Sequence, residues 1–93
     1  IPLDPASMTM VEGDISAEAE QVFSNLSAVA EAAGGTLDNA VKINISLTDL
    51  GDFAAVNTVM ARHFMEPYPA RACVQVAALP KGARIEVEAI LSL

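Results

Sequence analysis

The sequence predicts a single α+β domain, and three observations lead to this fold class. Apolar residues recur at helical spacing in two segments and alternate with polar residues in three others, in the order helix, strand, helix, strand, strand. The chain has 93 residues, 53% of them hydrophobic, which favours one packed domain over a disordered chain. A domain of this size buries only about 60 to 65% of its unfolded surface. We therefore expect part of its apolar surface to lie between copies of the chain.

The first helix is predicted to begin after Asp14 or Ser16, either of which can cap it. It should end at Gly34-Gly35, because glycine tolerates the left-handed backbone that stops a helix. Glu18 and the other polar residues of the segment are expected on its solvent side. The residues at helical spacing form an apolar face of Ile15, Ala19, Val22, Phe23, Leu26, Val29, Ala30 and Ala33.

A half-buried strand is predicted for Val41 to Leu47, where Val41, Ile43, Ile45 and Leu47 share one face. The turn Asp49-Leu50-Gly51-Asp52 follows, and Asp52 is expected to cap a second helix. This helix should end before Pro67. Its apolar face consists of Phe53, Val56, Met60 and Phe64.

Two further strands are predicted, from Ala70 to Val76 and from Arg84 to Leu91, with a turn at Pro80-Lys81-Gly82 between them. Both alternate with period two. We expect the two strands to be adjacent, with ionisable side chains on one face of the pair. Helices long enough to cover one face of this sheet leave the other face in need of cover.

Composition and charge argue against several classes of function. A net charge of -7, with 12 acidic and 5 scattered basic residues, repels phosphate backbones and anionic lipids, so neither nucleic acid nor a membrane surface is an expected partner. The lone Cys73 cannot form an internal disulfide and has no cluster of metal ligands around it. No apolar run approaches the roughly 18 residues of a membrane span. We expect a cytoplasmic protein without a metal or cofactor.

Arg71 and Glu86 are candidate site residues with two readings each. Arg71, early in its strand, could hold a carboxylate through paired hydrogen bonds, or form an ion pair with Glu86 or Glu88 across the strand pair. Glu86, among Ile, Val and Ala, could handle a proton or orient water, or could be a solvated outer carboxylate.

Three other residues have side chains that could take part in chemistry. Cys73 shares the face of Arg71, but the only histidine, His63, is separated from it by a helix and a loop, so Cys73 reads as a small packed residue. His63, near a helix C-terminus, reads as structural. Asn57 could bond inward or lie in solvent, and its spacing does not decide between these.

A long motif then resembles a known family. The segment from Tyr68 to Ile90, YPARACVQVAALPKGARIEVEAI, closely resembles the C-terminal signature of the reactive intermediate deaminase (Rid) family, formerly called YjgF-like. The likeness continues through Asp52–Asn57, Glu31–Gly34 and Ile1–Pro5, and so covers essentially the whole chain.

The resemblance implies a chorismate-mutase-like fold, half of it ferredoxin-like, assembled as a homotrimer with a central barrel and clefts between subunits. It implies cofactor-free hydrolysis of enamines and imines such as 2-aminoacrylate to 2-keto acids and ammonia. On the matching positions, Arg71 binds the substrate carboxylate, and Cys73 contributes backbone contacts. Glu86 positions or activates water, and Asn57 supports the cleft.

The chain departs from the family pattern at its start. Relatives carry a preceding segment with a Gly-Pro-Tyr motif and a strand ending in Ser-Gly-Gln, so residues 1–93 are expected to be a single Rid-type domain that is N-terminally incomplete. Met65 stands where many relatives have glycine. Two rival functions remain: a non-catalytic trimer that binds small carboxylic or keto acids, and an RNA-cleaving protein, which the acidic composition disfavours.

Overall fold

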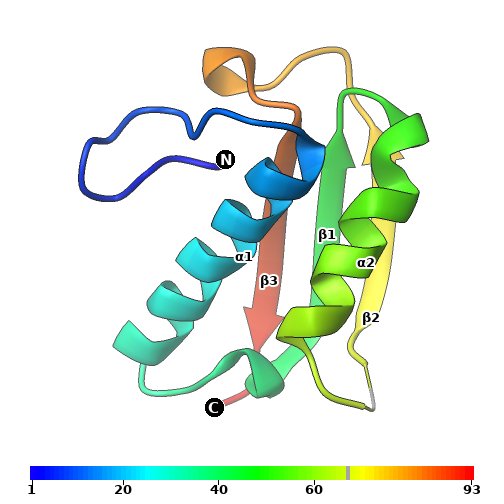
Figure 1. Ribbon diagram of the computed structural model, residues 1–93. Helices are drawn as coiled ribbons and strands as arrows, with labels where there is room; N and C mark the ends of the chain where they lie inside the picture. Colours follow the sequence, from blue (N-terminus) through cyan, green and yellow to red (C-terminus); the bar gives the residue numbers. More distant parts are fainter. Residues whose placement is uncertain (67) are drawn as a thin grey trace.

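The computed structural model describes residues 1–66 and 68–93, and it confirms the predicted order of elements (Figure 1). The predicted end of the second helix before Pro67 holds, but Pro67 itself lies outside the described residues. The helices and strands of the described chain are α1 (Ile15–Ala32), β1 (Ala40–Leu47), α2 (Phe53–His63), β2 (Ala70–Gln75) and β3 (Ile85–Leu91). Short 3-10 helices at Leu37–Asn39, Leu50–Asp52 and Pro80–Gly82 are labelled η1, η2 and η3.

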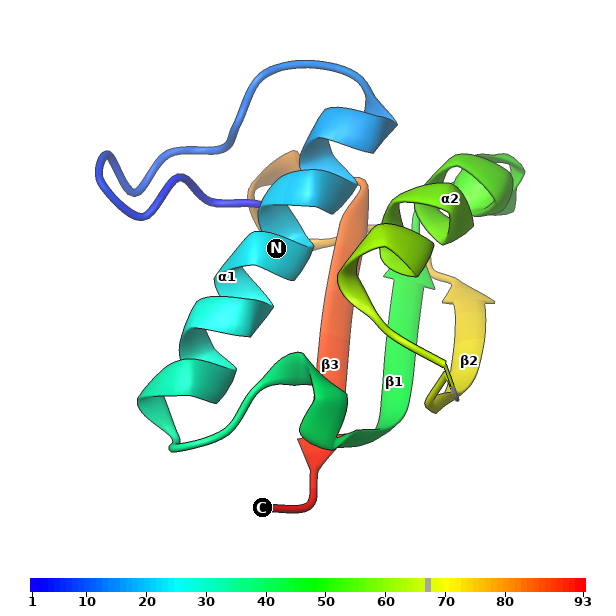
Figure 2. The ribbon, with the colours of Figure 1, turned by 60° about the horizontal axis from the view of Figure 1, so that its bottom comes forward.

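The sheet has the order β2-β1-β3, with β1 parallel to β2 and antiparallel to β3. The prediction that the last two strands are adjacent is therefore wrong. The crossover through α2 makes β2 parallel to β1, and β3 pairs with the other edge of β1, so β1 lies between them. Both helices lie on the same face of the sheet, and the described part of the chain places no helix on the other face (Figure 2).

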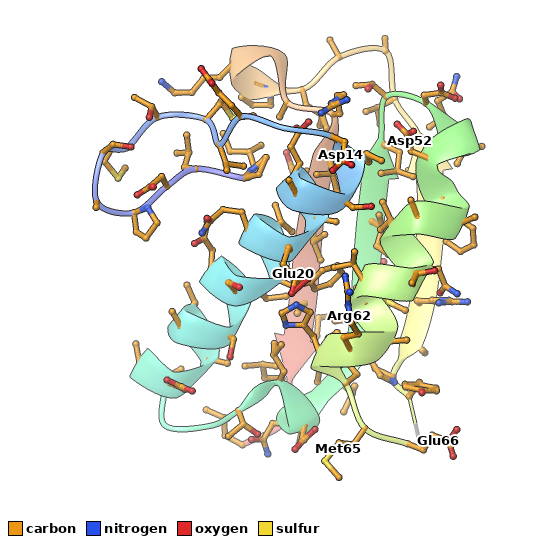
Figure 3. All side chains as sticks on the ribbon, in the orientation of Figure 1. Asp14, Glu20, Asp52, Arg62, Met65 and Glu66 are labelled. Atoms are coloured by element: carbon orange, nitrogen blue, oxygen red, sulfur yellow. The ribbon has the colours of Figure 1, made fainter. Side chains whose placement is uncertain are left out.

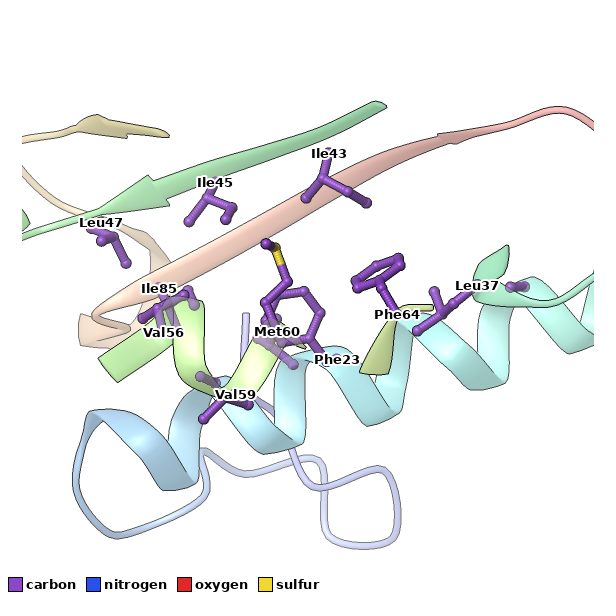
Figure 4. Close-up of a cluster of buried hydrophobic side chains, with 13 residues drawn as sticks. Phe23, Leu37, Ile43, Ile45, Leu47, Val56, Val59, Met60, Phe64 and Ile85 are labelled. Atoms are coloured by element: carbon purple, nitrogen blue, oxygen red, sulfur yellow. The ribbon is translucent and has the colours of Figure 1, made fainter. Parts of the chain in front are cut away.

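The hydrophobic core fills the space between the helices and the sheet (Figure 4). The period-two prediction for β1 is confirmed for Ile43, Ile45 and Leu47, each at most 1% exposed. It is wrong for Val41, which is 52% exposed because the pairing with β3 is irregular between Ala40 and Lys42. Burying each such aliphatic side chain stabilises the fold by roughly 1.5 to 3 kcal/mol, so β1 is the strand around which the domain packs.

The helix ends confirm one predicted cap and correct another. Asp14 caps α1, accepting a hydrogen bond from the backbone N–H of Ala17 at 2.9 Å. At the other end Gly34 has φ +92°, a conformation that disfavours a β-carbon. Asp52 makes no side-chain capping bond, because the chain reaches α2 already wound into η2. Asp49 caps η2 instead, accepting from the N–H of Gly51 at 2.8 Å.

A partly buried ion pair joins α1 to the start of β3. Glu18 is only 4% exposed, so the prediction that it lies in solvent is wrong. Its carboxylate accepts from the side chain of Arg84 and, at 3.3 Å, from the backbone N–H of that residue. Arg84 also donates to the carbonyl of Gly13 at 2.6 Å. These bonds satisfy the buried charge and set the position from which β3 runs toward Glu86.

Candidate functional site

Arg71 lies on edge strand β2 and faces the helices. It is in register with Ile43, whose side chain is fully buried beneath them, and neighbours in register share a face of a sheet. The Nη1 of Arg71 donates a hydrogen bond to Oδ1 of Asn57. Its Cζ also lies 5.3 Å from the centroid of the Phe53 ring. Two residues of α2 thus contact the guanidinium, and of the two alternatives for Asn57 the hydrogen bond is the one observed.

A cavity of about 260 Å³ opens beside this guanidinium. It is large enough for a small carboxylic acid and mostly apolar, with Arg71 as its cationic group. A second, larger cavity of about 540 Å³ shares Tyr68 and Pro69 with it but includes no arginine, so the smaller one is the candidate site. The residues lining the smaller cavity are Asn57, Met60, Ala61, Tyr68, Pro69 and Arg71.

Cys73 lies on the face of Arg71, as expected from the spacing, and packs against the core beside Ile45. Burial raises the pKa of its thiol, and the positive charge of Arg71 lowers it by a smaller amount. A thiol with a raised pKa is protonated at neutral pH and is a poor nucleophile. The expectation that Cys73 is a packed residue is confirmed, whereas its backbone contacts with a ligand stay a prediction.

Glu86 lies on the opposite face of the sheet from Arg71. It pairs with Ser46, which alternates along β1 with the buried Ile45 and Leu47, so Glu86 points to the face without helices. Strand β1 also separates the two residues laterally. The alternative prediction, an ion pair of Arg71 with Glu86 or Glu88, is therefore wrong within one chain, because both glutamates lie on the other face of the sheet. The described chain does not bring its two main candidates together.

His63 has the structural role expected of it. Its ring stacks on Phe23 with centroids 5.5 Å apart, and its Nε2 lies 3.1 Å from Oε1 of Glu20. Arg62 approaches the same glutamate at 3.6 Å, and Figure 3 shows Glu20 on α1 facing Arg62 on α2. This cluster joins the two helices and takes no part in the cavity beside Arg71.

Phe53 is the contact that sequence reasoning missed. It was assigned to the apolar face of the second helix, and it does pack partly against the core. A signal was present in its spacing: Phe53 and Asn57 are four residues apart and so share one face of a helix. Only the parallel pairing of β2 with β1 shows that this face meets Arg71.

Neither a metal site nor a membrane span is found in the described ranges. Residues 1–66 and 68–93 contain no group of three or more His, Cys, Asp or Glu side chains arranged to hold a metal ion. In the same ranges, neither helix has the length and apolar character that crossing a bilayer would need.

The fold and this site together define a small α+β domain with an arginine-bearing cavity beside an edge strand. Residues 1–92 match the family described as endoribonuclease L-PSP. The chain belongs to this family, the Rid or YjgF-like proteins.

Individual relatives agree with this assignment. The chain is 56% identical over 90 residues to protein DfrA of Myxococcus xanthus, covering 97% of this chain and 69% of the relative. It is 48% identical over 88 residues to the 2-iminobutanoate/2-iminopropanoate deaminase of Capra hircus, covering 95% of this chain. The chain spans 64% of the length of that relative, slightly less than two thirds.

Solved structures share the fold closely. The crystal structure of RidA from the Antarctic bacterium Psychrobacter sp. PAMC 21119 superposes with a TM-score of 0.95 at 56% identity, covering 99% of this chain and 74% of that one. The structure of E. coli TdcF with bound serine gives a TM-score of 0.89 at 36% identity, covering 97% of this chain and 72% of that one.

Proposed function

We propose that the protein hydrolyses reactive 2-imino acids and their enamine tautomers, such as 2-aminoacrylate, to 2-keto acids and ammonia, without a cofactor. The observation that carries this proposal is the guanidinium of Arg71, which lies beside a cavity of about 260 Å³, is held by Asn57 and sits over the ring of Phe53. An anchored arginine fork is suited to a carboxylate, which every 2-imino acid carries. The deaminase names of relatives such as those of Capra hircus and Homo sapiens support the same reaction.

In this reaction the protein needs mainly to position the imine and a water molecule. Water adds to the C2 carbon of the imine, the resulting carbinolamine loses ammonia, and a 2-keto acid remains. Because the imine is already activated toward water, holding it by its carboxylate and orienting one water molecule supplies most of the rate. In this proposal Arg71 holds the carboxylate, Cys73 contributes backbone contacts, and Glu86 moves the proton.

The proposed assembly is a homotrimer whose clefts lie between subunits. The sheet face without helices carries the exposed apolar residues Val74, 53% exposed, and Ile90, 56% exposed, which favour burial against other copies. Glu86 lies on that face, and Arg71 lies on the other. A small substrate held by Arg71 of one copy would therefore meet Glu86 across a subunit boundary.

The first test measures keto-acid release while a serine or threonine dehydratase generates the imine in the assay. Three reactions are compared: wild type, Arg71→Ala and no protein, after light scattering has established the assembly of each. We expect wild type to accelerate release above the spontaneous rate and Arg71→Ala to match the reaction without protein. Equal release in all three, from well-formed trimers, would refute the deaminase function.

A mixing experiment tests the shared cleft. Arg71→Ala and Glu86→Gln chains, each inactive alone, are unfolded together in equal amounts and refolded. If each site takes Arg71 from one copy and Glu86 from another, random assembly restores about a quarter of the wild-type rate, because that fraction of sites receives both intact residues. Refolded mixtures as inactive as the separate variants would contradict a cleft built from two copies.

A second candidate function is binding of small carboxylic or keto acids without turnover. The structure of E. coli TdcF with bound serine favours it, because serine carries a carboxylate. Calorimetry with 2-ketobutyrate and the dehydratase assay separate the two functions. A binder would retain affinity in the Glu86→Gln variant, and neither that variant nor wild type would release ammonia faster than the reaction without protein.

A further inference from the structure

The three phenylalanines of the chain have different surroundings. Phe23 and Phe64 are 0% and 5% exposed and pack edge to face in the core, with ring centroids 6.0 Å apart. Phe53 is only partly buried, and one face of its ring is turned to the guanidinium of Arg71. An aliphatic side chain could fill the core contacts of Phe53. It could not supply the negative π-face that attracts a cation.

The elements around Phe53 hold its ring in a fixed place relative to Arg71. Phe53 begins α2, and Asn57 follows one turn later, so both side chains reach β2 from the same helical face. The 3-10 helix η2, which leads directly into this helix, is tied to β2, because the backbone N–H of its first residue, Leu50, donates to Oε1 of Gln75 at 3.0 Å. The ring therefore belongs to a braced helix end, as a positioning group should.

We propose that Phe53 is a positioning residue for the carboxylate anchor: its ring sets the plane of the Arg71 guanidinium while Asn57 fixes one of its edges. A guanidinium has five N–H donors, and the bond to Asn57 uses one of them. Because Arg71 lines the cavity, the remaining donors can serve a ligand there. The inference rests on the proposed role of Arg71 and adds the residue that orients it.

The ring acts on the bound carboxylate only through Arg71. Stacking reduces the number of side-chain orientations that the arginine loses when a ligand binds, so affinity gains from preorganisation. The same contact makes no demand on the attacking water or on Glu86. We therefore expect changes at Phe53 to alter the affinity for carboxylates and the KM, and to leave kcat unchanged.

The test compares Phe53→Leu, Phe53→Tyr and the control Phe64→Leu, which removes a ring from the core without touching Arg71. The dissociation constant of 2-ketobutyrate is measured by calorimetry, together with kcat, KM and the thermal unfolding midpoint. Phe53→Leu should weaken binding and raise KM by about twofold to fivefold, the size of an exposed cation–π contact. Phe53→Tyr should bind like wild type, and Phe64→Leu should lower the unfolding midpoint without changing affinity.

A neutral analogue, 2-oxobutanamide, separates the charge contact from a general effect on the pocket. The loss in Phe53→Leu should be confined to the carboxylate ligand. Unchanged carboxylate affinity in a folded Phe53→Leu protein would overturn the inference, as would an equal loss in Phe64→Leu. So would a wild type that binds no carboxylate.

A different result would refute the proposed deaminase activity. A wild type that binds 2-ketobutyrate but does not accelerate imine hydrolysis refutes the activity alone. The effect of Phe53→Leu on the dissociation constant then still decides the role of the ring.

Discussion

Two arginines of the chain, Arg84 and Arg71, differ in the partners of their guanidinium groups. Arg84 is bound to the buried carboxylate of Glu18 and to the carbonyl of Gly13, so its charge is paired within the fold although its side chain is partly exposed. Arg71 bonds to the neutral amide of Asn57, lies over an aromatic ring and borders a cavity. It has no carboxylate partner among the ion pairs of the described residues.

The difference separates residues that stabilise the fold from residues that bind ligands. A buried ion pair that loses one member leaves an uncompensated charge, so Arg84 should matter for stability. An arginine whose neighbours are neutral keeps its charge for an incoming anion, so Arg71 should matter for binding. Substitutions at the two positions should therefore have separate effects on stability and on activity.

The largest expected effect is that of Arg71→Ala on ligand affinity. Loss of a paired, charge-assisted contact should weaken binding of 2-ketobutyrate by about 100-fold or more. The free energy of unfolding should change by less than about 0.5 kcal/mol, because the residue is exposed at the sheet edge. Calorimetry and urea titration measure the two quantities. A strongly destabilised variant would show that Arg71 is structural after all.

Arg84→Met should show the reverse pattern. It leaves Glu18, 4% exposed, without its counter-charge, and should reduce the free energy of unfolding by about 3 kcal/mol. At temperatures where the variant remains folded, its dissociation constant for 2-ketobutyrate should match wild type. Urea denaturation supplies the stability. If Arg84→Met weakened binding as much as Arg71→Ala does, the assignment of a structural role to Arg84 and a binding role to Arg71 would be wrong.

Asn57→Ala should have an intermediate effect, confined to the ligand. Removing the acceptor that holds one edge of the guanidinium should raise the dissociation constant for carboxylates about tenfold, at nearly unchanged stability. Asn57→Asp is the informative partner variant, because its carboxylate would neutralise Arg71 and make it resemble Arg84. We expect calorimetry to show weaker binding in Asn57→Asp than in Asn57→Ala, and the opposite order would contradict this account.

Cys73→Ser should have the smallest effect on activity. The thiol is not expected to take part in the chemistry, and the backbone at this position is retained, so turnover should remain within about twofold of wild type. The dehydratase assay measures it. A loss as large as that of Arg71→Ala would make the thiol itself part of the site.

The raised pKa of Cys73 also fixes the sign of a pH effect. The native state holds the thiol proton more tightly than the unfolded chain does. Its contribution to stability is therefore fully present below the ordinary thiol pKa and is lost as pH rises through the raised value. Urea titrations of wild type and Cys73→Ser from pH 7 to 10 should show the wild type losing stability relative to the variant only in the alkaline part. A constant difference would contradict the shift.

Local patterns in the sequence predicted the elements well but not their neighbours. The alternation of Ile43, Ile45 and Leu47 identified β1 and its buried face, because burial on one face imposes a period of two. The same logic could not place β1 between β2 and β3. Strand order depends on where the α2 crossover leaves the chain, and neighbours in sequence suggested a hairpin that does not form.

The candidate site shows the same limit. Arg71, Cys73 and Asn57 were identified from residue type and family resemblance, and the structure places all three on the helix-covered side of β2. Glu18 was misplaced because its partner Arg84 lies 66 residues away, where no helical or strand period reaches. Contacts between segments that are distant in the sequence can be identified only once the fold is known.

The link between Glu18 and Arg84 should also set how long the native state survives. The elements β1, α2 and β2 follow one another along the chain, whereas this ion pair joins residues 66 positions apart. Closing so long a loop has a high entropic cost, so we expect this contact to form late in folding. An interaction absent from the transition state changes the unfolding rate and leaves the folding rate nearly constant. Stopped-flow kinetics of Arg84→Met should therefore show faster unfolding at an unchanged folding rate. The contact between the buried Glu18 of α1 and the half-exposed Arg84 before β3 would then govern the lifetime of the folded chain.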